Sequence, residues 1–168
     1  MQKKTHIAFG VLLFAILTSI FSMNWTLAVF AALGAFFPDI DWLLDKKYIP
    51  AIIKKYTWNL IFKVGIHRTL LHNVWVLTIA TYLFLLLSGS WAASTAFAVG
   101  IISHLIADSI TLSGIYWLWP FGDNRIFGQK RYFFINGPVK TGGASEYAFQ
   151  TAVYIVSGIL FAKKLNII

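Results

Sequence analysis

The sequence has 168 residues, of which 58% are hydrophobic and only 12% are charged. Soluble domains are roughly 45–50% apolar and about a quarter charged, so this composition excludes an ordinary water-soluble surface. A net charge of +8 suggests nucleic-acid binding in a soluble protein, but here the basic residues fall in short clusters between apolar runs. That pattern anchors and orients membrane proteins. We therefore expect a polytopic membrane protein that binds no nucleic acid.

Five apolar runs approach or reach the length of about 20 residues with which a helix crosses a bilayer. They cover about 6–22, 25–44, 66–87, 91–112 and 147–162. The first follows a basic MQKK start, but no A-x-A-like site closes it, so we expect a retained span rather than a signal peptide. Residues 45–63 interleave lysines with aromatic and aliphatic residues, which is typical of an interfacial amphipathic segment. The predicted fold is one all-α domain over 1–168, a transmembrane bundle of about five spans plus this segment.

Positive charge is distributed unequally among the connections. Basic residues cluster at the N-terminus, between the second and third spans, and between the fourth and fifth, whereas the SMN and SGS turns carry none. The positive-inside rule places the basic connections in the cytoplasm of an inner (plasma) membrane. Lys163 and Lys164 disagree with five crossings and leave the side of the C-terminus open.

The ionisable residues within these runs all fall on the predicted cytoplasmic side. Such groups are costly in a membrane and usually mark function. They comprise all four histidines and three of the six acidic residues, namely His6, Asp39, Asp41, His67, His72, His104 and Asp108. Imidazole and carboxylate are ligands that zinc, manganese or iron accept without thiolate, and the chain has no cysteine. Seven candidates indicate two ions that share ligands, or one ion whose imidazoles are oriented by neighbouring carboxylates.

Spacing along the chain indicates which of these residues can act together. His104 and Asp108 are four apart and share a helix face. The two aspartates of PDID would point the same way if the chain is extended there. In HRTLLH, His67 and His72 lie about 140° apart on a straight helix. Either His67 precedes the first turn, or the two histidines serve different partners.

The order of these motifs resembles a known family. The elements are TH, then PDID, then HR-x-x-x-H, then SHLIAD-S-x-T-x-x-G followed by LWPF. They are similar to the YdjM-like, LexA-regulated bacterial inner-membrane proteins, which are described as metal-dependent hydrolases. The resemblance covers residues 6 to about 121, implies a multi-span membrane hydrolase, and adds Arg68 and Glu146 to the site residues. Trp42 stands where relatives often have histidine, and Leu71 where they have threonine; the first departure removes one candidate ligand.

The leading hypothesis is a metal-dependent hydrolase that cleaves an ester or phosphoester of a lipid or lipid-linked substrate, because the site lies near headgroup level. Asp41 or Glu146 would act as the general base. Arg68, helped by Arg125 or Lys140, would stabilise developing negative charge. Zinc is the expected ion, with one or two bound, and manganese or iron are alternatives.

Two other classes of function use the same cluster. One is a carrier or channel for divalent cations or protons, although such sites tend to lie near the midplane between repeats. This chain has one-sided polar groups and no internal repeat. The other is a non-catalytic membrane module that binds metal or a protein partner. Membrane lipids are the expected partners in each case, and the pattern specifies neither the substrate nor the oligomeric state.

Overall fold

The computed structural model describes residues 1–21, 24–44, 71–119, 121 and 134–164. This part of the chain is mostly helical, which confirms the prediction of a helical protein. The helices in chain order are α1 (Lys3–Phe21), η1 (Trp25–Leu27), α2 (Ala28–Phe36), η2 (Phe37–Leu44), α4 (Val74–Ser88), α5 (Trp91–Ser109) and α7 (Ala144–Lys164). Two short strands, β1 (Ile115–Tyr116) and β2 (Phe134–Ile135), pair antiparallel.

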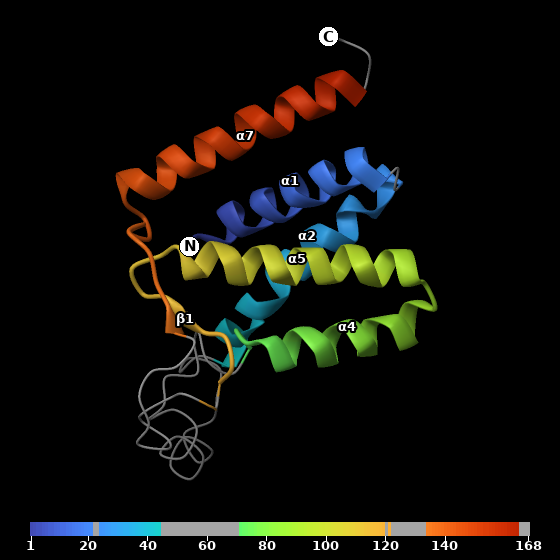
Figure 1. The fold of residues 1–168 in the computed structure, drawn as a ribbon, viewed down its shortest axis with the longest axis horizontal. Coiled ribbons are helices and arrows are strands. Elements are labelled where there is room, and N and C mark those ends of the chain that lie inside the picture. Colours follow the sequence, from blue (N-terminus) through green and yellow to red (C-terminus); the bar gives the residue numbers. More distant parts are fainter. Residues whose placement is uncertain (22–23, 45–70, 120, 122–133, 165–168) are drawn as a thin grey trace.

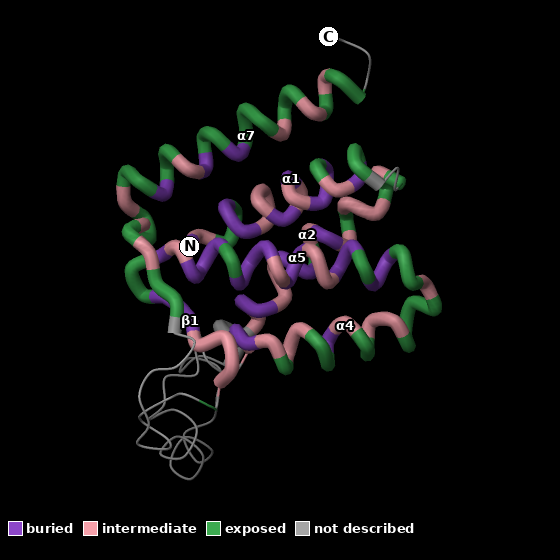
Figure 2. Tube along the Cα trace, viewed as in Figure 1, coloured by how far each residue is buried: buried purple, intermediate pink, exposed green. Residues whose placement is uncertain are grey.

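The α5 helix is the centre of the bundle. It packs against α1, α2 and α4, while α7 lies on the outer side of α1 (Figure 1). Buried residues concentrate on α5, α1 and α2, whereas α4 and α7 keep long exposed faces (Figure 2). Small residues allow the central contact, because a Cβ at Gly34 would collide with the Phe97 backbone and one at Gly100 with the Ala31 backbone. Glycine at such positions lets two helices approach closely.

One end of the bundle gathers the parts of the chain that carry the predicted site. The starts of α1, α4 and α7 lie there, together with η2 and the end of α5 (Figure 1). This follows because consecutive helices reverse direction. At one of these reversals Gly89 ends α4 with φ 63°, in the left-handed region that favours glycine. Ser90 then caps α5 by accepting the Ala93 N–H.

Two described helices, α1 over Lys3–Ile20 and α5 over Trp91–Ser109, are long and apolar enough to cross a membrane. The apolar helices Trp25–Ile40 and Val74–Ser88 are shorter. The five-span arrangement therefore stays a prediction. The expected amphipathic segment, 45–63, lies outside the described residues.

The structure shows the local geometry at two motifs for which the sequence left alternatives open. The PDID segment is a 3-10 helix rather than extended chain, and residues two apart on such a helix do not share a face. In the described part of the third apolar run, residues 71–73 are not helical and α4 begins at Val74, where the Asn73 side chain caps the helix by accepting the N–H groups of Trp75 and Val76, both at 3.0 Å. His72 therefore directly precedes the cap instead of lying within a helix.

Candidate metal centre

Three buried side chains from three parts of the chain meet at this end of the bundle. Asp39 comes from η2, His72 from the residue before the α4 cap, and His104 from α5. His104 Nε2 lies 3.0 Å from His72 Nε2 and 3.8 Å from Asp39 Oδ1, and His72 Nε2 lies 3.9 Å from that oxygen. Two donors on one tetrahedral zinc ion, with bonds of about 2.0–2.1 Å, lie about 3.3 Å apart. These three atoms are therefore close to the spacing of ligands around one ion.

Asp108 connects these residues to His6. Its Oδ2 lies 3.6 Å from His72 Nε2 and 3.8 Å from His104 Nε2. Its Oδ1 lies 3.3 Å from His6 Nε2 and accepts a hydrogen bond of 2.6 Å from the Met1 amino group. The His6 ring stacks on that of His104, with centroids 3.7 Å apart. His6, His104 and Asp108 form a second group that could hold a metal ion.

A backbone carbonyl fixes the orientation of His104. Its Nδ1 lies 2.7 Å from the carbonyl oxygen of Ala35. Because a carbonyl only accepts, Nδ1 carries the proton, and the neutral ring presents the lone pair of Nε2 toward His72 and Asp39. A backbone carbonyl often orients a metal-binding imidazole in this way. The sequence pattern did not indicate a role for Ala35. The one sequence feature that could have pointed to it is the run of small residues that lets α2 approach α5.

The chemistry of the cluster fits a divalent cation. His72 and His104 are 0% exposed, Asp108 is 1% exposed and Asp39 is 6% exposed. Burying carboxylates away from water is costly unless their charge is compensated. The Met1 amino group already compensates part of the charge of Asp108, and a cation among the imidazoles would balance the carboxylate charge that remains. Nitrogen with oxygen donors suits zinc, manganese or iron.

Glu146 lies at the start of α7 and belongs to neither group. Its Oε1 accepts the Gln2 N–H at 2.6 Å, and its Oε2 accepts the Gly142 N–H at 2.7 Å. Burial raises the pKa of this carboxyl, but the two N–H donors outweigh that effect and hold the pKa below its ordinary value. Glu146 therefore ties the start of α7 to the residues that precede α1.

Replacing Glu146 with glutamine is expected to destabilise the protein at neutral pH and to make less difference in acid. A folded-state pKa below the unfolded value of about 4.5 stabilises the fold above that pH, and this contribution is lost as pH falls through the folded pKa. Thermal unfolding in detergent from neutral pH to below the folded pKa would show the two proteins converging. Other titrating groups are common to both, so a gap that is independent of pH would contradict the assignment.

The structure describes only some of the other predicted site residues. His67, Arg68 and Arg125 lie outside the described residues. Asp41 lies on η2, but its side chain is not described. Lys140 is exposed, and its backbone N–H donates to the Ser145 hydroxyl at 3.2 Å. Of the seven predicted metal ligands, the structure brings five together: His6, Asp39, His72, His104 and Asp108.

These features define a helical protein with membrane-type apolar helices and, at one end, a buried His and Asp cluster that could hold a metal ion. The chain belongs to the YdjM inner membrane protein family, whose model matches residues 1–164. This match confirms the resemblance seen in the motifs and extends it to α7. Comparisons with curated proteins and with solved structures gave no match.

Proposed function

We propose that this protein is a metal-dependent hydrolase of the inner membrane that cleaves an ester or phosphoester. The observation that carries the proposal is the cluster of buried nitrogen and oxygen donors from η2, the α4 cap region and α5, at separations of 3.0–3.9 Å. The substrate class that we propose is a lipid or a lipid-linked molecule at the cytoplasmic leaflet. The cluster lies at the bundle end where the described chain stops at Leu44 and resumes at residue 71, and the lysine-rich segment lies between these two positions in the sequence, which supports this choice.

We assign one zinc ion to the donors His72, His104, Asp39 and Asp108. The Nδ1 of His104 is already bonded to Ala35, so this ring has one nitrogen left for a metal, which favours one ion over two that share it. His6 then stands beside the other oxygen of Asp108 and orients that carboxylate. Manganese or iron would accept the same donors.

A bound divalent ion supplies a Lewis acid that lowers the pKa of water toward neutrality and polarises an ester or phosphoester oxygen. The chain's own residues hold the reacting groups and move the proton. Asp41 is our proposed general base. Arg68, four residues before His72, is the proposed donor to negative charge that develops on the substrate, because a guanidinium matches a phosphate with two hydrogen bonds. Glu146 holds the start of α1 in place.

Chelation is expected to abolish hydrolysis, and a stoichiometric amount of zinc should restore it, because the buried donors alone offer no Lewis acid. The measurement is turnover of a phospholipid and phosphoester panel by the full chain purified in detergent, before and after treatment with a chelator. Turnover that survives chelation would contradict a metal-dependent reaction.

A liposome flux assay on the same preparation tests the carrier alternative directly. We expect no zinc or proton flux above protein-free liposomes. Flux without turnover of any substrate would overturn the hydrolase proposal in favour of transport.

A further inference from the structure

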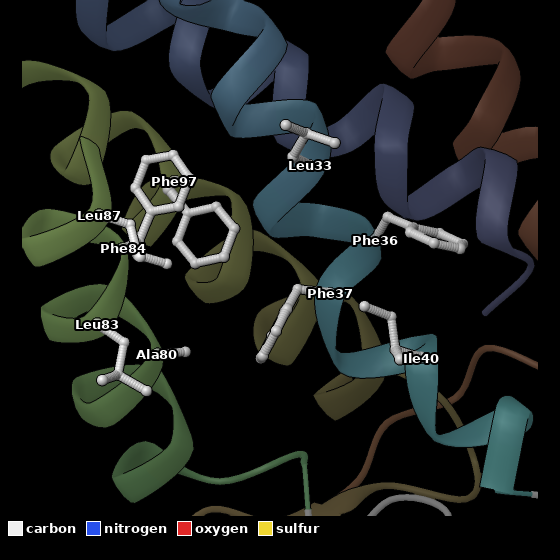
Figure 3. Close-up of a pocket in the computed structure, with 9 residues that line it drawn as sticks. All are labelled: Leu33, Phe36, Phe37, Ile40, Ala80, Leu83, Phe84, Leu87 and Phe97. Carbon is white, nitrogen blue, oxygen red and sulfur yellow. The ribbon is translucent and has the colours of Figure 1, made fainter.

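An apolar groove lies between α2–η2 and α4, with α5 behind it (Figure 3). Its volume is about 380 Å³, within the range of roughly 300–1,000 Å³ that ligand pockets occupy. All the residues that line it are apolar, and those used below are Phe37, Ala80, Leu83, Phe84, Leu87 and Phe97. Such a lining suits a hydrocarbon and offers no side-chain hydrogen bond to a polar ligand.

Aromatic rings hold the shape of this groove. Phe84 from α4 and Phe97 from α5 stack with centroids 4.5 Å apart and planes at 9°. Phe37 from η2 meets Phe97 edge to face at 5.6 Å. Figure 3 shows these rings beside Ala80 and Leu83 on α4. Rings that pack on one another keep the walls in place, so the groove is preformed.

The groove lies on the elements that also carry the candidate metal centre. Phe97 precedes His104 by seven residues on α5, which is about two turns on nearly the same face and about 10 Å along the axis. Phe37 precedes Asp39 by two residues on η2. On α4 the first residue that lines the groove is Ala80, eight residues after His72. A molecule that lies in the groove can therefore extend toward the His and Asp cluster, which lies about two helical turns away along α5.

The opposite side of the groove opens onto an apolar surface. Leu87 is 87% exposed, Leu83 is 52% exposed and Leu33, on α2, is 50% exposed. In an inner membrane protein such a surface faces lipid, so a hydrocarbon chain can enter from the bilayer without crossing water. The groove thus lies between a surface that contacts acyl chains and the bundle end whose cluster fits a cation.

We propose that this groove binds one acyl chain of a membrane phospholipid and directs its phosphoester to the metal centre. The inference rests on the proposed function for its headgroup end. An amphiphile with an anionic phosphate and an apolar tail matches the two ends of the site, since the phosphate complements the cation that the cluster fits and the tail complements the groove. If the groove binds the tail, the acyl chain as well as the headgroup determines which substrates the protein accepts.

The test uses the full chain, stripped of metal by a chelator, in vesicles of phosphatidylethanolamine and phosphatidylglycerol with a trace of phospholipid that carries a diazirine on its acyl chain. After irradiation, mass spectrometry maps the labelled residues. We expect label to concentrate on groove residues of α4, such as Leu83, Phe84 and Leu87. Equal labelling of the outer face of α7, for example at Ile159, would overturn the proposal.

A matched pair of leucines on α4 separates the groove from general contact with lipid. Leu83 lines the groove and is 52% exposed, whereas Leu86 is 62% exposed and does not line it. Leu83→Trp, which fills the space of about two methylene groups, is expected to reduce groove labelling roughly tenfold, and Leu86→Trp should leave it unchanged. Both side chains are exposed, so neither substitution strains the core. Equal labelling in the two variants would contradict the inference.

A cross-linking experiment distinguishes a bound phospholipid from a protein segment in the groove. A photoreactive benzophenone amino acid in place of Leu87 should cross-link to phospholipid, and cross-links to this chain or to another protein instead would overturn the proposal. Because labelling needs no metal and no turnover, the two proposals fail separately. Groove labelling without zinc-dependent hydrolysis would support the groove and overturn the hydrolase. Zinc-dependent hydrolysis with uniform labelling would overturn the groove alone.

Discussion

Replacing His104 with alanine is expected to weaken metal binding by more than about 100-fold, because loss of an outer partner of a ligand already costs about 10–100-fold. Among the described residues, His104 is the one that both groups that could hold an ion share. Its Nε2 lies within 3.8 Å of donor atoms on His72, Asp39 and Asp108. Its removal therefore breaks both groups at once, and turnover should be lost with the metal.

The measurement is metal content and zinc affinity of the purified protein, compared with Ser103→Ala. Ser103 is the buried neighbour of His104, and its hydroxyl donates to the Gly100 carbonyl at 2.7 Å. It offers the site no ligand, so this control should bind metal as the wild type does. His72→Ala should resemble His104→Ala. Unchanged metal content in both histidine variants, with the folds intact by thermal unfolding, would contradict the assignment.

Replacing Gly100 with alanine is expected to lower the free energy of unfolding by about 1–3 kcal/mol, the typical cost of overpacking. An added Cβ would overlap the backbone of Ala31 and Ala35 on α2, and a backbone cannot move aside as a side chain does. Because the Ala35 carbonyl orients His104, displacement of α2 should also weaken metal binding.

Gly158→Ala is the matched control for that substitution. This glycine lies on α7, and nothing lies within 4 Å of the position that its Cβ would take. The same change there is expected to stabilise the protein by about 0.5–1 kcal/mol through helix propensity. Thermal unfolding in detergent compares the two variants, and effects of the same sign would contradict the close α2–α5 contact.

Much of the candidate site could be predicted because ionisable groups in apolar runs are few and their sides follow from alternating crossings. His104 with Asp108 was the strongest case, since residues four apart on one helix need no tertiary information to meet. The prediction that His6, Asp39 and His72 join this pair relied on the predicted order and direction of the membrane crossings. The structure brings all five residues to one end of the bundle, although their role as ligands stays a proposal.

The details that tertiary contacts decide could not be predicted. The PDID segment could be extended or helical on local grounds, and the structure has a 3-10 helix there. The Ala35 carbonyl that orients His104 belongs to a backbone 69 residues away, and a backbone partner leaves little signal in a sequence. The apolar groove could not be predicted either. Its walls come from α2, η2, α4 and α5, and the sequence of each of these segments alone is that of an ordinary apolar helix.

The most direct measurement is the X-ray absorption spectrum of the zinc-loaded protein, compared with that of His72→Ala. We predict two imidazole nitrogens together with carboxylate oxygens at about 2.0–2.1 Å, and one imidazole fewer in the variant. A spectrum with oxygen ligands alone, or one that the substitution leaves unchanged, would contradict a metal centre built from His72, His104, Asp39 and Asp108.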